Sequence, residues 1–271
     1  MPELLSLSTV MLITGAVGGL LAGLLGVGGG IVIVPMLEFA LSRLGVDPSI
    51  RMHIAVATSL ATIIPTSISS SRAHYKREAV DISLARNWAA WIFIGALLGT
   101  WVASLVHSRV LSAIFAGVAF LVALKMILPL DGKTLTDRVP RGPLMAPVPT
   151  LIGFISTMMG IGGGSLSVPI LTLLGEPIHR AIGTAALFGL LIAIPGTLGF
   201  MLSGYGNPLL PPGSIGYVNL VGLVLIVPMT VLAAPLGARL AHAMNKRHLT
   251  LFFGVFLLIV AIRMLLRTLQ A

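Results

Sequence analysis

A long uncharged stretch sets the strongest limit on how this chain can fold. Residues 181–238 contain no Asp, Glu, Lys or Arg. A helix needs about 20 apolar residues to cross the hydrocarbon core of a bilayer, so this stretch is long enough for two crossings. Only 9% of the whole chain is charged, whereas soluble domains carry about 25% charged residues. We therefore expect an integral membrane protein with no separate soluble domain.

The charge balance limits the kinds of molecule that we expect the protein to bind. The chain has 17 Lys and Arg residues against 8 Asp and Glu residues. The basic residues are scattered over segment ends and short loops, which is typical of the positive-inside bias and not of a nucleic-acid surface. The absence of cysteine excludes disulfides and thiolate metal sites. The start Met1-Pro2-Glu3 lacks the basic region and cleavage site of a removable signal peptide, so we expect the first apolar segment to be retained.

Hydrophobic periodicity predicts an all-α polytopic fold in which some helices are broken. The runs at 31–42, 145–159 and 165–174 are too short to cross a core of about 30 Å at about 1.5 Å per residue. A glycine cluster joins the run 5–25 to the first of them. The complete set of apolar runs is 5–25, 31–42, 53–71, 88–106, 110–130, 145–159, 165–174, 181–203, 214–238 and 248–266.

An internal repeat relates the two halves of the chain. The cluster Gly26–Gly30, followed by Pro35, recurs as Gly160–Gly164 followed by Pro169, and the segment 53–59 resembles 179–185. The order of these blocks is preserved, which indicates a duplication with changes in loop length.

The repeat predicts the organisation of the chain. We expect a first membrane repeat at 1–130, a polar linker with the start of the second repeat at 131–149, and a second membrane repeat at 150–271. The two repeats form one integrated transmembrane domain.

The distribution of basic residues favours inverted halves. If each glycine-broken unit crosses the membrane once, the 17 basic residues divide 10 to 7 between the two sides. If each broken unit returns to its own side, or crosses twice, they divide 12 to 5. The second arrangement follows the positive-inside rule better, places both termini on the outer side and inverts one half relative to the other. The five basic residues on the poorer side are then Arg43, Arg51, Arg109, Arg263 and Arg267.

The paired glycine clusters are the strongest candidates for a ligand site. Backbone that is unwound at membrane depth is tolerated only where it lines a cavity or is buried in protein. Glycines allow positive φ and a close approach to a ligand, and the following helix directs free N–H groups and a positive dipole end towards it. Such a pocket favours an anion. The residues are Gly28, Gly29 and Gly30 in the first half and Gly162, Gly163 and Gly164 in the second.

Helix packing is the alternative role for glycine. Gly15, Gly19 and Gly23 recur every four residues, as do Gly95 and Gly99, and this spacing is typical of closely packed membrane helices. We assign these five to packing. Three adjacent glycines cannot all lie on one packing face, so the clusters themselves are interpreted as substrate site.

Hydroxyl side chains near the clusters extend the candidate site. Ser165 and Ser167 follow the second cluster but have no hydroxyl counterparts at Ile31 and Ile33, so the two halves are expected to contribute unequally. Thr58, Ser59 and Thr184 lie one to two turns inside the next helix of each half and are candidate ligands of an oxyanion. Their alternative role is to bond backbone carbonyls of their own or neighbouring helices.

Three titratable residues are candidates for coupling or gating. His53 and His179 start equivalent segments and could carry protons, or they could be solvated side chains at the membrane surface. Glu38 could bind a coupling ion or pair with Arg43. The histidines lack metal-ligand spacing, and no nucleotide, zinc-hydrolase or nucleophile motif is present, so we expect no metal, no cofactor and no enzymatic activity.

These motifs resemble a known family. The repeated GxGGG-x4-P pattern, the following His-x-Ala-x-[Ala/Gly]-Thr segment and the many apolar segments are similar to the sulfite exporter TauE/SafE family, over essentially the whole chain. The resemblance implies secondary transport, without ATP hydrolysis, of sulfite, organosulfonates or related sulfur oxyanions. As binding residues it carries over the two glycine clusters with their prolines, and it extends to a threonine in each half. These residues are Gly28, Gly29, Gly30, Pro35 and Thr58 in the first half and Gly162, Gly163, Gly164, Pro169 and Thr184 in the second.

The sequence thus predicts a multi-pass protein of the bacterial inner membrane that moves a small anion by alternating access. An anion channel and a non-transport membrane assembly factor are the alternatives. The expected partners are a small anionic substrate and the lipid bilayer. Coupling to protons and a homodimer are left open, and no nucleic acid is expected.

Overall fold

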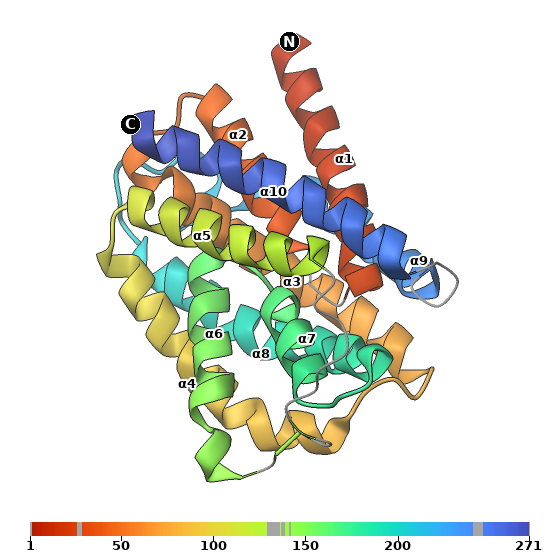
Figure 1. Cartoon of the computed structure of the whole chain (residues 1–271). Coiled ribbons are helices and arrows are strands. Elements are labelled where there is room, and N and C mark those ends of the chain that lie inside the picture. Colours follow the sequence, from red (N-terminus) through yellow and green to blue (C-terminus); the bar gives the residue numbers. More distant parts are fainter. Residues whose placement is uncertain are drawn as a thin grey trace.

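The chain forms a bundle of helices. The computed structural model describes residues 2–25, 29–128, 136, 139–140, 142–240 and 246–270. Within this part the helices and strands are α1 (Pro2–Leu25), α2 (Gly30–Arg43), α3 (Pro48–Tyr75), α4 (Ile82–Leu105), α5 (Ser108–Ile127), the 3₁₀ turn η1 (Pro143–Met145), α6 (Pro147–Met159), α7 (Gly164–Leu173), α8 (Ile178–Ser203), β1 (Ser214–Ile215), β2 (Val218–Asn219), α9 (Leu220–Leu240) and α10 (Lys246–Gln270) (Figure 1).

The predicted all-α membrane architecture is confirmed. Each predicted apolar run has a helix at its position, and among the described residues α3, α4, α5, α8 and α9 are each long and apolar enough to cross a membrane. The run at 214–238 begins differently from the prediction. Its first residues form the antiparallel hairpin of β1 and β2, because Gly213 and Gly216 adopt positive φ angles of 78° and 53° and turn the chain before α9 begins.

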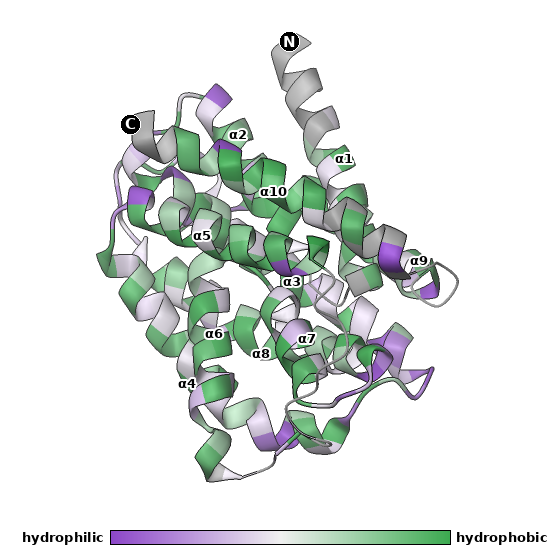
Figure 2. Cartoon of the chain, in the orientation of Figure 1, coloured by the Kyte–Doolittle hydropathy of each residue, from purple (hydrophilic) through white to green (hydrophobic). Residues whose placement is uncertain are grey.

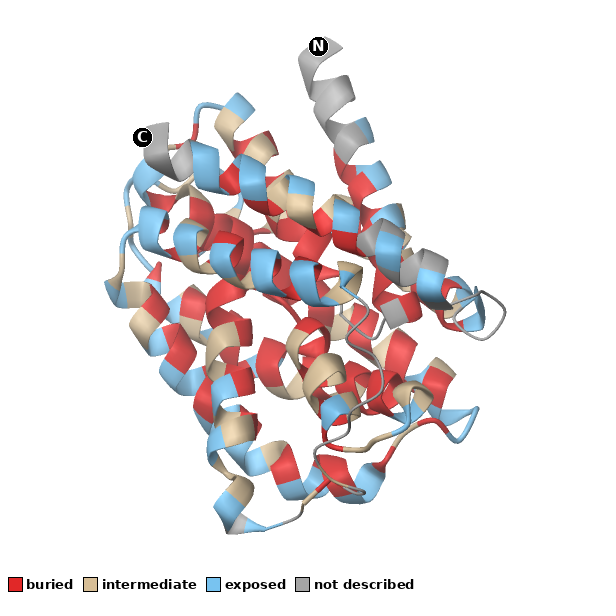
Figure 3. Cartoon of the chain, in the orientation of Figure 1, coloured by how far each residue is buried: buried red, intermediate tan, exposed pale blue. Residues whose placement is uncertain are grey.

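Helices α3 and α8 lie antiparallel at the centre of the bundle. Ser67 lies beside Gly189, and Leu60 lies beside Gly196, so residue numbers fall along one helix as they rise along the other. In the apolar window of α3, 78% of residues are buried, compared with 28% in α9. Figure 3 shows the buried residues gathered on these central elements and the exposed ones on the outer faces of α5 and α10.

The remaining helices pack in reciprocal pairs. Helix α1 runs parallel to α9, and α4 runs parallel to α6, while α5 and α10 lie side by side. A Cβ added at Gly15 would lie 2.7 Å from the carbonyl oxygen of Ile226, and one added at Gly99 would meet the backbone of Phe154. The predicted packing role of these spaced glycines is therefore confirmed: they allow two helix backbones to touch.

Each glycine-broken unit folds back on itself. Helix α2 returns along α1, since Gly29 and Ile33 both lie against Gly18. Helix α6 leads away from the end of the bundle where α4 begins. Helix α7 returns to that end, because Arg180, which pairs with Glu176 just beyond α7, also pairs at 2.9 Å with Asp81 at the start of α4.

Hydrophilic residues occur mainly towards the ends of the helices and in the connections, and hydrophobic residues make up most of the helices between them (Figure 2). At one end, Arg43 and Arg263 both lie over the ring of Phe39, 5.2 and 4.8 Å from its centre. Arg51 and Arg109 line a cavity at the same end. Four of the five residues that the returning arrangement assigns to the poorer side thus lie together.

Replacing Gly95 by Ala should destabilise the protein, because the new Cβ would clash with the backbone of Thr150 and push α4 away from α6. Overpacking of this kind costs about 1–3 kcal/mol. Gly117→Ala on α5 is the matched control, since nothing lies within 4 Å of its added Cβ, and helix propensity favours Ala by up to about 1 kcal/mol. Thermal unfolding in detergent should show a lower melting temperature for Gly95→Ala only. Equal melting of the two variants would contradict this packing account.

Candidate functional site

The two glycine breaks meet in the middle of the bundle. A Cβ added at Gly30 would run into the carbonyl oxygen of Gly160 and would lie 3.0 Å from Ser59 Oγ. The Ser59 hydroxyl donates a hydrogen bond to the Gly160 carbonyl at 2.7 Å. Ser59 and Gly30 belong to the first half and Gly160 belongs to the second. The contact therefore joins the two halves where their helices are interrupted.

Both short helices begin at a glycine in the left-handed conformation. Gly29 precedes α2 with φ 75°, and Gly163 precedes α7 with φ 74°. Neither helix has a side chain capping its first turn, so its leading N–H groups depend on other partners. Gly30 and Gly164 are the first residues of the two helices, whereas Gly28 lies outside the described residues.

Buried hydroxyl groups surround the second break. Ser67, Ser156, Ser165 and Ser167 are all at most 4% exposed, and their hydroxyl oxygens have no hydrogen-bond partner among the described residues. A Cβ at Gly163 would lie 3.6 Å from Ser167 Oγ and 3.8 Å from Ser156 Oγ. Buried polar groups are normally paired, so a cluster of unpaired hydroxyls is a place where a polar ligand or water is expected.

The first break has no such cluster. At the repeat offset of 134 residues, Ser165 and Ser167 correspond to Ile31 and Ile33, which are fully buried apolar side chains. These are the two serines for which the sequence predicts unequal halves. The first break contributes backbone and packing, and the second contributes the side-chain hydroxyls.

A polar strip on α3 leads from this cluster towards one end of the bundle. Ser67, Ser70, Ser71 and His74 lie at helical spacing on one face, and all four are buried. The Ser70 hydroxyl is also without a partner, and His74 Nε2 lies 3.1 Å from the carbonyl oxygen of Gly23. A buried polar face this long is unusual in a membrane helix and marks α3 as the polar wall of the interior.

Thr58 and Thr184 lie away from the breaks and hold the two repeats together. The Thr58 hydroxyl accepts a hydrogen bond from the backbone N–H of Asn219 at 2.9 Å, and the Thr184 hydroxyl accepts one from the N–H of Asp81 at 2.9 Å. Each threonine belongs to one half, and each N–H belongs to the other. We call these two bonds the crossed threonine bonds.

The residues held by the crossed threonine bonds are themselves helix caps. The side-chain oxygen of Asp81 accepts from Leu84 N at 2.9 Å at the start of α4, and that of Asn219 accepts from Gly222 N at 2.8 Å at the start of α9. A threonine of the opposite half thus fixes the residue from which each of these helices begins.

His53 is enclosed by backbone carbonyls and a hydroxyl. Its Nδ1 lies 3.1 Å from Ser108 Oγ and its Nε2 lies 3.1 Å from the carbonyl oxygen of Ala103, while its ring packs 5.1 Å from that of Tyr217. The side chain ties the end of α4 and the start of α5 to α3.

The other two coupling candidates lie at opposite ends of the bundle. His179 is half-buried at the start of α8, beside Arg180, whose guanidinium bonds to Asp81 at 2.9 Å. Glu38 lies 3.8 Å from Arg51. None of His53, His179 and Glu38 lies among the unpaired hydroxyls.

Comparison with known proteins places the chain. The family model described as "Sulfite exporter TauE/SafE" matches residues 11–264. The chain belongs to this family. It is 36% identical to a probable membrane transporter protein of Haemophilus influenzae, covering 94% of this chain and 97% of that protein. It is 26% identical to a probable membrane transporter protein of Methanocaldococcus jannaschii, covering 97% of each. No solved structure matches the chain.

Family membership and the helices long enough to span a bilayer establish a multi-pass membrane protein of a transporter family. The resemblance read from the glycine motifs is therefore confirmed. In this TauE/SafE protein, Gly30, Gly160 and Ser59 meet at the breaks, and Ser165 joins an adjoining cluster of hydroxyls.

Sequence reasoning did not single out Ser67, Ser70, Ser156 and His74. The signal was present for α3, where hydroxyls and a histidine recur at positions 67, 70, 71 and 74. For Ser156 no local signal exists, because a single serine in an apolar run most often bonds its own helix.

Removing either threonine hydroxyl should destabilise the protein. Thr58→Val or Thr184→Val leaves a buried backbone N–H without an acceptor, which costs about 1–3 kcal/mol. Thr62→Val is the matched control, since this equally buried hydroxyl donates only to the Ser59 carbonyl of its own helix. Thermal unfolding should show a lower melting temperature for the two test variants than for the control. A control as unstable as the test variants would refute the crossed threonine bonds as a special support.

Proposed function

We propose that this protein is a secondary active transporter of a small anion, of the class of sulfite, organosulfonates and related sulfur oxyanions, working by alternating access. The observation that carries the proposal is the group of buried, unpartnered hydroxyls of Ser67, Ser156, Ser165 and Ser167 beside the second glycine break. We propose these serines, with the backbone of Gly163 and Gly164, as the substrate site.

The chemistry of this site suits an oxyanion. A deprotonated sulfur oxyanion presents several acceptor oxygens, and the site presents hydroxyl donors together with the first N–H groups of α7 and the positive end of its dipole. These donors are neutral, so the site itself has no formal charge that would have to lose its water when the substrate binds. A neutral donor set binds an anion strongly enough to select it and still allows release, as a carrier requires.

The arrangement of the repeats supports alternating access between inverted halves. The equivalent helices α3 and α8 lie antiparallel, which is the relation expected when a two-fold axis lies in the membrane plane. The pairing of α1 with α9 is reciprocated by that of α6 with α4, as such an axis requires. We infer that the halves rock about the meeting point of the glycine breaks and expose the site to one side at a time.

The closed interior fits a carrier between its two open states. Ser67, Ser156 and Ser167 are at most 1% exposed, so a substrate reaches them only after helices separate. We propose that the polar strip of α3 supplies the path on one side. His74 lies at the end of this strip, so we propose it, in place of His53 or His179, as the candidate for coupling or gating. Basic residues are richer at this end, which the positive-inside rule assigns to the cytoplasm.

Substitution of the serines tests the site. Ser165→Ala and Ser167→Ala each remove a donor to a charged ligand, worth about 1.5–3 kcal/mol, so affinity should fall about tenfold or more. The measurement is thermal-shift titration of the purified protein with sulfite, thiosulfate, sulfoacetate, sulfate, lactate and chloride. Thr172→Val on the same helix is the matched control, because its hydroxyl bonds carbonyls of α7 itself. Unchanged affinity in both serine variants would rule out this site.

Transport kinetics separate a carrier from a channel. In proteoliposomes loaded with a labelled sulfur anion, unlabelled anion added outside should accelerate the release of the label. Uptake should also saturate as the anion concentration rises. The chain has no cysteine, so Ser167→Cys introduces a unique thiol. A saturating concentration of the transported anion should slow the reaction of this thiol with a small thiol reagent. Linear flux without counterflow would favour an anion channel, and no flux with any anion would favour a non-transport role.

A further inference from the structure

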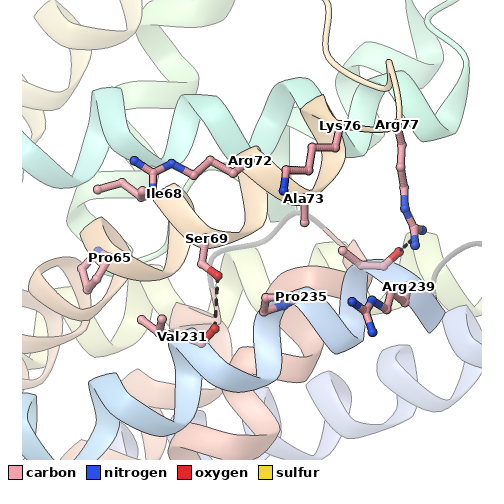
Figure 4. A pocket seen from close by; sticks show the side chains of 11 residues that line it. Pro65, Ile68, Ser69, Arg72, Ala73, Lys76, Arg77, Val231, Pro235 and Arg239 are labelled. Atoms are coloured by element: carbon pink, nitrogen blue, oxygen red, sulfur yellow. Dashed lines mark hydrogen bonds between the residues drawn. The ribbon is translucent and has the colours of Figure 1, made fainter.

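A groove between α3 and α9 lies outside the proposed transport site. It encloses a volume of about 610 Å³, within the range of about 300–1,000 Å³ typical of small-molecule sites. Figure 4 shows the two helices facing each other across it, with Arg72 and Lys76 on α3 and Arg239 on α9. The groove opens at the end of the bundle that is rich in basic residues.

The mouth of the groove carries an excess of positive charge. Arg72, Lys76, Arg77 and Arg239 line it, and no acidic side chain is among its described lining residues. Arg77 donates to the carbonyl oxygen of Ala238 at 3.0 Å, which fixes it across the mouth. Arg72, Lys76 and Arg239 form no ion pair with any described residue, and all three are exposed. Three basic residues that line one groove and pair with no described acid are suited to an anionic partner.

The groove becomes apolar with depth. From Lys76 it extends along α3 to Pro65, a length of about 16 Å at about 1.5 Å per residue, which is close to half of a hydrocarbon core of about 30 Å. Ile68, Val231 and Pro235 line this deeper part. Because α9 is the least buried of the long helices, the groove faces the lipid side of the bundle and not its centre.

The inner wall of the groove is closed towards the transport site. Ser69 Oγ donates to the carbonyl oxygen of Val231 at 3.1 Å, and Thr66 Oγ1 donates to Thr230 Oγ1 at 2.9 Å. Both bonds join α3 to α9 between the groove and the polar strip. A soluble anion entering here would meet apolar side chains and a sealed wall, whereas an amphiphile with an anionic head and an apolar tail matches both ends of the groove.

We propose that this groove binds one anionic phospholipid, with its phosphate on Arg72, Lys76 and Arg239 and an acyl chain against Ile68, Val231 and Pro235. The lipid would occupy the leaflet at the basic end of the protein and would bridge α3, which carries the polar strip, to α9. This site is independent of the serine cluster, so its test does not depend on which substrate is transported.

Native mass spectrometry of the purified protein tests the site, with phosphatidylglycerol and phosphatidylcholine of identical acyl chains. The native chain should retain one phosphatidylglycerol in preference to phosphatidylcholine. Arg72→Gln combined with Arg239→Gln should weaken that binding at least about tenfold, since each basic residue contributes roughly a factor of five near an anionic head group. Arg43→Gln combined with Arg86→Gln removes the same charge from outside the groove and should bind as the native chain does.

Two further variants and one competitor keep the result decisive. If the glutamine pair fails to fold, two other variants still test the site. Arg72→Lys combined with Arg239→Lys preserves the charge and should retain binding of phosphatidylglycerol. Lys76→Gln alone should weaken this binding to an intermediate degree. Equal retention of the two lipids, or equal loss of phosphatidylglycerol in the control pair, would overturn the proposal. Displacement of phosphatidylglycerol by millimolar inorganic phosphate would overturn it in favour of a free-anion site.

Discussion

A helix that breaks inside a bilayer leaves backbone groups that lipid cannot satisfy, and the protein must bring a partner to them. In this chain one such partner comes from the other half. Gly30 abuts Gly160, and the Ser59 hydroxyl completes the contact by donating to the Gly160 carbonyl. The central position of α3 and α8 follows from this meeting, because these two helices flank both breaks. The close α1–α9 and α4–α6 packing then holds the first helix of each broken unit in place.

The two halves of the chain pack in a similar way around an interior to which they contribute different side chains. Packing between helices is reciprocal, and equivalent threonines make equivalent bonds across the halves. The side chains at the breaks do not follow this symmetry, since Ser165 and Ser167 stand where the first half has isoleucine. The packing surfaces must match in both halves for the bundle to close, whereas the proposed substrate site requires donors from one half only.

Much of this architecture could be predicted from the sequence. Apolar runs located the helices, and the repeated glycine clusters located the breaks, because both depend on local chain properties that a bilayer enforces strictly. Membership of the TauE/SafE family was likewise visible in the motif spacing. The start of α9 was missed, since two glycines with positive φ allow the chain to turn and pair as a hairpin before the helix.

The roles of individual polar residues were harder to predict. Thr58 and Thr184 were expected near an anion, yet their hydroxyls accept backbone N–H groups more than a hundred residues away in sequence. His53 was a proton-carrier candidate and is held by the ends of α4 and α5. Ser67 and Ser156 were not singled out at all. These assignments depend on which helices become neighbours, and one-dimensional spacing does not contain that information.

The crossed threonine bonds also constrain the order in which the protein can be assembled. Asp81 is synthesised 103 residues before Thr184, and Thr58 is synthesised 161 residues before Asn219. During synthesis the first half therefore enters the membrane with the anchor of α4 unmade and with a buried hydroxyl still unbonded. The first five helices cannot reach their final form alone, and the second half completes them as it arrives.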